Sequence, residues 1–317
     1  MTDLKLTKLE KKIKKAYSRA TREMKKKVRD TFRDYEEMCE RWQERIDSGK
    51  ASEEEFAEWR KKRAYTNEVN AEMIKVLSED TYHSNEIAAN MIREHMFDIY
   101  SLNVNRTAYN IDAYIGFYTN FTLYSKATVE RLIEENPELL PKMKVDKKKD
   151  LRWNKAKIRN ELTQGILQGE SVQKIADRFE RVVGMNRNVA IRNARTATTS
   201  AQNGGRMASY ERAQSIGVEC KKMWLAAMDN KTRHSHRLLD GQVQDLDKPF
   251  KSILGKIMMP GDPNADDPAD IYNCRCKIIA PTKYTTFDPK DLSTRFYRLP
   301  KGTTYEQWKN LQVVDPE

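Results

Sequence analysis

Apolar side chains recur every three or four residues along most of this chain, which is the spacing of an amphipathic helix. The first such stripe consists of Leu6, Leu9, Ile13, Tyr17, Ala20, Met24, Val28, Phe32, Tyr35, Met38, Trp42 and Ile46. It predicts one long helix that ends at Ser48-Gly49, because glycine readily adopts the left-handed conformation that closes a helix.

A second helix is predicted to begin after Ser52, which forms a capping box with Glu55, and to run to about Ser78. Two long helices with a short connection predict an antiparallel hairpin. The apolar stripe is equally suited to binding another protein, and the pattern alone leaves both uses open.

The middle of the chain is also predicted to be helical, with several breaks. Residues 84–136 are rich in aromatic side chains, which favour a packed core, and the stretch 103–115 is less regular. Proline residues follow, and Lys147–Lys149 form either a linker or a helix start. Further helices are predicted over 151–169, 171–179 and 186–216, with a break at Gly184.

After residue 217 the pattern changes to short strands and loops. Val218–Met228 and Cys276–Ala280 are predicted strands, and the loops between them are rich in proline and aspartate. The expected fold is therefore mainly α with a small C-terminal α+β domain. We expect an N-terminal helical region over 1–140, a basic linker and helices over 141–217, the small module over 218–280, and an extended tail over 281–317 with one short helix at 304–311.

Composition excludes several classes of protein. The chain has 317 residues, of which 38% are hydrophobic and 33% charged. No apolar run approaches the roughly 18 residues of a membrane span, and the N-terminus lacks the apolar core of a secretory signal. Four cysteines in a chain of this length do not make a disulfide framework, so we expect synthesis in a reducing cytoplasm.

The positive charge is concentrated in a few segments. The formal net charge is +11, and residues 1–33 hold 13 Lys and Arg against 4 Asp and Glu. Such segments suit non-specific contact with the phosphates of double-stranded DNA, although a solvated helix face has the same composition. The predicted DNA contacts are Lys11, Lys12, Lys14, Lys15, Lys25, Lys26, Lys27, Lys147, Lys148 and Lys149.

The most specific residues are gathered near the C-terminus. They comprise a Gly-Ile-x-x-Gly-x-Ser helix end at 165–171, an Ala-Arg-Thr helix that contains Arg195, and the residues Trp224, Asp229, Arg233, His236, Asp240, Gly241, Asn273, Cys274, Arg275 and Cys276. Together, from about Asn160 to Ile279, they resemble the phage minor head protein family, also called the Mu F-like head-morphogenesis family.

This resemblance implies a minor structural protein of a tailed-phage head. Such a protein is made in the host cytoplasm and lies inside the capsid of the virion, at the portal vertex. The expected partners are the portal protein, capsid or scaffolding protein, and packaged DNA, with which some members are thought to leave at ejection. No membrane contact is expected.

The resemblance also raises the question of a zinc site. Relatives carry Cys-x-x-Cys where this chain has Arg233 and His236, and a histidine shortly before the last two cysteines, so ligands are missing here. Only His234, His236, Cys274 and Cys276 remain, and alternate residues of a strand point to opposite faces. We therefore predict a metal-free module without cofactor.

Polar contacts are expected to replace the metal. The sequence suggests that Arg233 forms a charge network with Asp229 and Asp240, and that His236 bonds a backbone carbonyl near Cys274. These residues would then hold the strands and loops of the module together.

No enzymatic activity is predicted. The alternative is a metal-dependent nuclease or another DNA-processing enzyme, because a basic protein with a histidine-containing loop superficially resembles one. However, the sequence shows no second histidine at a suitable spacing after that loop. ADP-ribosyl transfer through Arg195-Thr196 is disfavoured because this pair lies inside a predicted helix.

Overall fold

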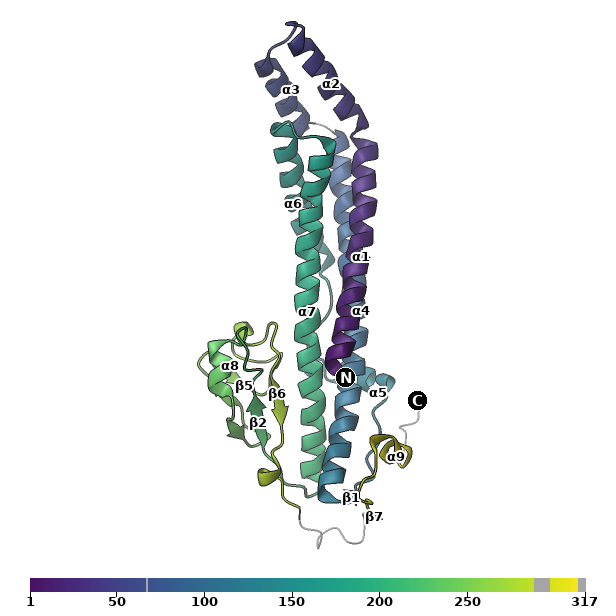
Figure 1. The fold of residues 1–317 in the computed structure, drawn as a ribbon, viewed down its shortest axis with the longest axis vertical. Coiled ribbons are helices and arrows are strands. Elements are labelled where there is room, and N and C mark those ends of the chain that lie inside the picture. The colour runs from purple at the N-terminus through teal and green to yellow at the C-terminus, as the bar shows by residue number, and fades with distance from the viewer. Residues whose placement is uncertain (67, 288–296, 313–317) are drawn as a thin grey trace. The chain divides into compact units, whose positions relative to one another are not determined.

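The structure, a computed structural model, describes residues 1–66, 68–287 and 297–312. Its helices are α1 (Thr2–Thr31), α2 (Arg33–Asp47), α3 (Glu53–Thr66), α4 (Glu68–Ile115), α5 (Lys126–Glu135), α6 (Lys147–Leu167), α7 (Val172–Ser215), α8 (His234–Leu239) and α9 (Tyr305–Asn310). Its strands are β1 (Phe117–Tyr118), β2 (Lys222–Leu225), β3 (Val243–Gln244), β4 (Phe250–Ser252), β5 (Gly255–Ile257), β6 (Lys277–Ile279) and β7 (Tyr297–Arg298). The mainly helical class with small C-terminal sheets is confirmed (Figure 1).

The predicted helix ends are mostly confirmed by their caps. The capping box at Ser52 is present, since its hydroxyl accepts from the N–H of Glu55 at 3.1 Å and the Glu55 carboxylate accepts from the N–H of Ser52 at 2.8 Å. Gly49 has φ +69° and Gly217 has φ +92°, as expected of residues that close helices. Lys147 is the first residue of α6, so its lysine run is a helix start and not a linker.

The helix lengths differ from the prediction in several places. The second predicted helix, expected to run to about Ser78, ends as α3 at Thr66, and α4 begins at Glu68. The first helix is divided at Phe32, where buried Phe32 packs edge-on against Tyr35. α4 continues to Ile115 through the stretch expected to be irregular, and α7 runs unbroken through Gly184. A glycine costs a helix only about 1 kcal/mol, which the packing of a 44-residue helix offsets.

The described residues divide into two compact units, neither of which is one stretch of sequence. One unit comprises 1–9, 92–143 and 192–317, and the other comprises 10–91 and 144–191. The long helices α1, α4 and α7 contribute to both units, because each pairs with helices distant in the sequence. The consecutive ranges 1–140, 141–217, 218–280 and 281–317 therefore stay a prediction and do not coincide with these units.

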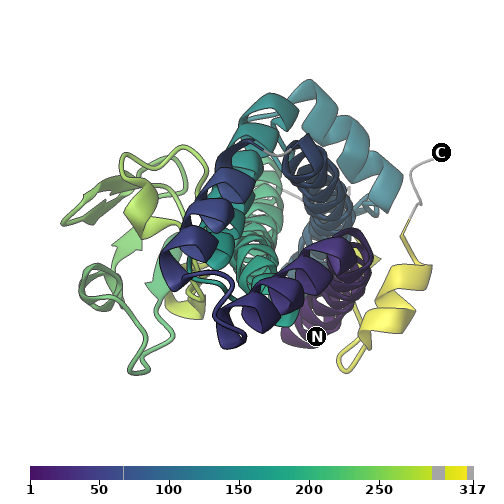
Figure 2. The same cartoon turned by 90° about the horizontal axis from the view of Figure 1, so that it is seen from above.

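The unit of residues 10–91 and 144–191 is a helical bundle. Figures 1 and 2 show α1, α4, α6 and α7 side by side in it. Its core contains a buried polar network, in which the Tyr17 hydroxyl donates to Asn85 at 2.6 Å and the Asn85 amide donates to Asp150 at 3.0 Å. Such a network fixes the register of neighbouring helices, because any shift leaves a buried polar group without a partner.

The predicted helical hairpin is formed by α2 and α3. Its two helices are joined by an aromatic cluster, with Tyr35 stacked on Trp59 at 5.9 Å between ring centroids and Trp42 stacked on Phe56 at 5.6 Å. The apolar stripe of this segment therefore packs against other residues of the same chain.

The other unit contains the strand-and-loop module. An antiparallel sheet of order β3-β2-β6 is accompanied by the hairpin β4–β5, and the module lies beside α7 (Figure 1). The first predicted strand, 218–228, is shorter than expected: only Lys222–Leu225 pairs with β3 and β6. The second, 276–280, is confirmed as β6 over Lys277–Ile279.

The C-terminal segment is anchored by a fully buried tryptophan. α9 begins with a capping box of Thr304 and Gln307, as its predicted range 304–311 suggests. The indole Nε1 of Trp308 donates to the buried carboxylate of Asp112 at 2.8 Å. The expected extended tail is thus partly packed, while residues 288–296 and 313–317 lie outside the described residues.

None of the helices in the described ranges combines the length and apolar character needed to cross a bilayer.

Candidate functional site

The module is joined to α7 through the edge of strand β6. Asn203, which is fully buried, accepts a hydrogen bond from the N–H of Ile278 at 2.9 Å and donates to the carbonyl of Cys276 at 3.3 Å. Arg206 donates to the carbonyl of Ile278 at 2.9 Å, and the hydroxyl of Tyr210 accepts from the N–H of Ala280 at 3.1 Å. Helix side chains therefore satisfy the strand edge in the way that a neighbouring strand would.

The same face of α7 holds the Asn-Cys-Arg-Cys segment. The hydroxyl of Thr196 accepts from the N–H of Asn273 at 3.1 Å, and the hydroxyl of Thr199 donates to the carbonyl of Cys274. The Ala-Arg-Thr motif thus acts through Thr196, whereas Arg195 is exposed on the helix. We call Thr196, Thr199, Asn203, Arg206 and Tyr210 the polar stripe of α7.

The loop that passes over α7 depends on a glycine. Gly261 has φ +79°, and a Cβ at this position would lie 2.7 Å from the backbone nitrogen of Ser200. Only glycine permits both this conformation and this close approach. The carbonyl of Pro260 then accepts a hydrogen bond from Asn203 at 3.0 Å.

The stretch from Trp224 to Gly241 folds back on itself. Trp224 is fully buried and packs edge-on against His236 and Phe250, at centroid distances of 5.4 and 5.3 Å. The carboxylate of Asp240 accepts from the N–H of Ala226 at 2.8 Å, and Gly241, at φ +75°, donates from its N–H to the carbonyl of Trp224 at 2.9 Å. These motif residues therefore stabilise the module itself.

The predicted charge network has different partners. Asp229 pairs with Arg275, whose guanidinium donates to both carboxylate oxygens, one at 2.7 Å, and this pair holds the pKa of Asp229 well below its usual range. Arg233 instead donates to the carbonyl of Tyr272. The expected pairing of Arg233 with Asp229 and Asp240 is thus wrong, because Arg275 reaches Asp229 from the opposite loop and Asp240 caps β2.

His236, Cys274 and Cys276 converge at the centre of the module, and we call them the His–Cys–Cys cluster. Nδ1 of His236 lies 3.5 Å from Sγ of Cys274 and 3.5 Å from Sγ of Cys276. All three side chains are 2% exposed. The hydrogen bond from Cys274 and the nearby imidazole lower the pKa of Cys276 below that of a free thiol.

The sequence argument against this convergence was wrong. It assumed that Cys274 and Cys276 lie within a strand, but β6 begins only at Lys277, and Asn273 has φ +53°. The turn at Asn273 lets both thiols point to one centre. His236 contacts these sulfur atoms and not the backbone carbonyl expected, and His234 is exposed at the start of α8 and is not part of the cluster.

The predicted DNA contacts all lie in the unit of residues 10–91 and 144–191, on α1 and the first turn of α6. All are exposed except Lys25, which is half-buried. The ammonium of Lys25 lies 2.7 Å from Asp177 and 2.5 Å from Glu180, and that of Lys27 lies 2.5 Å from Asp80. These internal ion pairs make Lys25 and Lys27 poorer candidates for phosphate contact than their neighbours.

Comparison with known proteins agrees with this arrangement of motifs. The family model described as "Phage Mu protein F like protein" matches residues 156–279, which include most of α6, all of α7 and the module. The minor head protein GP7 of Bacillus phage SPP1 is 34% identical over 217 residues, which cover 65% of this chain and 67% of that protein. The chain belongs to the Mu F-like family of phage minor head proteins.

A second relative is named as an enzyme. The NAD(+)–arginine ADP-ribosyltransferase EFV of Enterococcus faecalis is 32% identical over 122 residues, which cover 38% of this chain and 25% of that protein. No solved structure matches this chain significantly.

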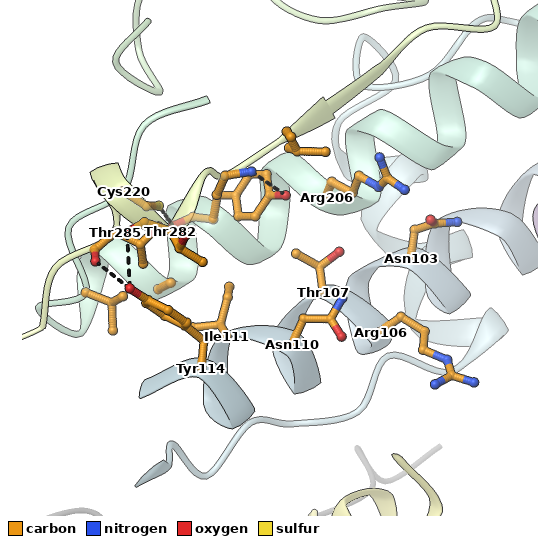
Figure 3. A pocket seen from close by; sticks show the side chains of 15 residues that line it. Asn103, Arg106, Thr107, Asn110, Ile111, Tyr114, Arg206, Cys220, Thr282 and Thr285 are labelled. Atoms are coloured by element: carbon orange, nitrogen blue, oxygen red, sulfur yellow. Dashed lines mark hydrogen bonds between the residues drawn. The ribbon is translucent and has the colours of Figure 1, made fainter. Parts of the chain in front are cut away.

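This chain also contains a pocket of about 320 Å³ beside the module (Figure 3). It is lined by α4, α7 and the segment after β6, and none of the fifteen described lining residues is acidic. Figure 3 shows Arg106 and Arg206 toward one end, and Tyr114 with Thr282 and Thr285 toward the other. Burial lowers the pKa of Arg206, whose guanidinium donates to the carbonyl of Ile278.

One buried lysine makes stability depend on pH. Lys222 is fully buried, its ammonium donates to the carbonyl of Leu246 at 2.9 Å, and burial lowers its pKa from 10.5 to about 8. Below about pH 8 both folded and unfolded chains are protonated here. Above that value the unfolded state binds more protons, so the free energy of unfolding is expected to rise by up to about 3 kcal/mol as the pH approaches 10.5.

Urea denaturation of the wild type and of Lys222→Met between about pH 8 and pH 10 measures this effect. The free energy of unfolding of the variant is expected to lack this rise with pH. Relative to the wild type, the variant is therefore expected to be most stable at the low end of this pH range. Parallel pH profiles for both proteins would show that Lys222 keeps an ordinary pKa.

Sequence reasoning named Thr196 and Asn203 among the motif residues of this helix, but it missed the other members of the polar stripe of α7 and the buried carboxylate of Asp270. A signal for the stripe existed, because its members follow one another at spacings of three and four along a helix face otherwise made of small and apolar residues. Asp270 had no such signal, since it stands among several aspartates in a proline-rich loop.

Proposed function

We propose that this protein is a structural component of the phage head that acts in head morphogenesis at the portal vertex and contacts packaged DNA through its basic helices. The observation that carries the proposal is the match to GP7, which extends over about two thirds of both chains. The internal use of the motif residues supports a structural module: in the described part of the chain their polar groups bind strands and loops.

The basic helices support the DNA contact. Lys11, Lys12, Lys14 and Lys15 are exposed on successive turns of α1, and Lys148 and Lys149 are exposed at the N-terminus of α6. The amides of a helix N-terminus carry partial positive charge, which adds to that of the lysines. Such a surface binds phosphates without reading base sequence.

The decisive experiment is quantitative mass spectrometry of purified particles and of a portal pull-down. A few copies of the protein per head, retained with the portal protein, are expected. Its absence from particles would overturn the head role, whereas its presence in particles without portal retention would overturn only the placement at the vertex.

The affinity for duplex DNA is expected to fall steeply with salt. Fluorescence anisotropy of a labelled duplex measures the slope of log K against log salt concentration. Glutamine at Lys11, Lys12, Lys14 or Lys15 removes one positive charge from the phosphate-binding surface, and each such substitution is expected to reduce that slope by about 0.9. Lys25→Gln is the matched control on the same helix, because Lys25 is paired with Asp177 and Glu180. Equal slopes for all variants would exclude this helix as the DNA contact.

No enzymatic activity is proposed. The match to the transferase EFV covers a quarter of that protein, which is too little to carry its activity over. For the nuclease alternative, His236 would be the base, yet it is 2% exposed and packed against Trp224 and the two thiols. Incubation with supercoiled plasmid and divalent cations is expected to leave the DNA intact, and cleavage that His236→Ala removes would contradict this.

A further inference from the structure

The His–Cys–Cys cluster has the spacing of a tetrahedral metal site. Zinc binds cysteine sulfur at about 2.3 Å and histidine nitrogen at about 2.0–2.1 Å, so two such ligands on one tetrahedral ion lie about 3.6 Å apart. Nδ1 of His236 is 3.5 Å from each of the two sulfur atoms. Both nitrogen–sulfur distances thus agree with this value, and the three ligand atoms all lie within 4.8 Å of one another.

The backbone around the cluster is held in place from outside it. Thr196 and Thr199 bind the backbone of Asn273 and Cys274, and Asn203 binds that of Cys276. His236 comes from the short helix α8 and is fixed by edge-on packing against Trp224. The ligands are therefore preorganised by the polar stripe of α7, which reduces the cost of ordering them around an ion.

The second nitrogen of the histidine faces a carboxylate. Nε2 of His236 lies 3.4 Å from Oδ1 of Asp270, which is 2% exposed and accepts a hydrogen bond from the Ser235 hydroxyl at 2.8 Å. Histidines that bind metals through one nitrogen usually direct the other nitrogen to a carboxylate or carbonyl, which fixes the tautomer and orients the ring. Asp270 explains why Nδ1 and not Nε2 faces the sulfur atoms.

We infer that His236, Cys274 and Cys276 bind one Zn²⁺ ion, with Asp270 orienting the imidazole and the fourth position taken by a ligand from outside the cluster. Sulfur and imidazole ligands together favour zinc over magnesium or calcium. Zinc binds cysteine in its thiolate form, and two thiolates balance the charge of the ion in this buried place. The inference does not depend on the proposed role in the head.

Metal content of the purified full-length protein is the first test. Plasma mass spectrometry is expected to find close to one zinc per chain after gel filtration. After chelation, titration with Co²⁺ is expected to give the near-ultraviolet charge-transfer band of thiolate ligands and the intense visible bands of tetrahedral coordination. This measurement uses the wild type, so it does not depend on the folding of any variant.

Single substitutions assign the ligands. Cys274→Ser, Cys276→Ser and His236→Asn are each expected to lose the cobalt bands, and Asp270→Asn is expected to weaken zinc binding about 10- to 100-fold in chelator competition. Cys220→Ser is the matched control, because Cys220 is a buried thiol of the same core but belongs to no group of three or more possible metal ligands in the described residues.

Two results would overturn the inference. One is protein without zinc that shows no cobalt band although Cys274 and Cys276 are reduced and can be alkylated after unfolding. The other is a disulfide between these two cysteines, detected as the loss of two hydrogens by intact mass.

Discussion

Replacing Trp308 by alanine is expected to lower the free energy of unfolding by about 3–5 kcal/mol, the usual range for deleting a buried aromatic side chain. Trp308 is fully buried, contacts the rings of Tyr109, Phe121 and Tyr305, and donates to the carboxylate of Asp112. The substitution leaves a cavity and removes one donor from a buried carboxylate. Chemical denaturation followed by circular dichroism measures the change.

One further variant separates packing from hydrogen bonding. Trp308→Phe keeps most of the ring but loses the indole donor, so it is expected to cost about 1–3 kcal/mol. Thr119 still donates to Asp112 in this variant, through its hydroxyl at 2.7 Å. The alanine variant is also expected to expose α9 to limited proteolysis. A loss below about 1 kcal/mol with α9 still protected would show that Trp308 is not the anchor of this segment.

Replacing Asn203 by leucine is expected to be at least as damaging, although the two side chains have the same number of heavy atoms and the same branching. The side chain of Asn203 bonds the N–H of Ile278 and the carbonyls of Pro260 and Cys276. Each buried backbone group left without a partner costs about 1–3 kcal/mol, so the total expected loss for the three groups is about 3–9 kcal/mol. Thermal unfolding of the full chain measures the change.

Asn203→Asp separates the hydrogen bond that the side chain accepts from the two that it donates. Its carboxylate still accepts from Ile278 but cannot donate to the two carbonyls, and it brings an uncompensated charge into the core. Hydrogen exchange is expected to show faster exchange at Ile278 in the leucine variant than in the aspartate variant. Equal exchange in both would mean that another group protects this strand edge.

The helices were predictable because their apolar positions repeat with the period of the helix, and most of their ends carry local caps. Their lengths were less predictable. Gly184 resembles a local break, yet it lies inside α7, because the packing of the whole helix outweighs the preference of one residue. Phe32 divides the first helix without any glycine or proline to indicate it.

The site was predictable in its membership but not in its geometry. Sequence motifs selected Cys274, Cys276 and His236, but the direction of their side chains depends on the left-handed turn at Asn273 and on where β6 begins. The partner of Asp229 could not be chosen either, since several arginines stand within the module. Such choices depend on loop paths, which have no periodic signal.

The strand edge closed by α7 has a consequence for which segment of the protein can be transferred to another chain intact. Residues 218–280 taken alone would carry β6 with an open edge, which invites pairing with other chains. The piece that can be inherited or grafted intact therefore includes the C-terminal half of α7. The family match begins at residue 156, well before the first strand of the module. Helix and sheet thus form one structural unit, although they look like separate parts in the sequence.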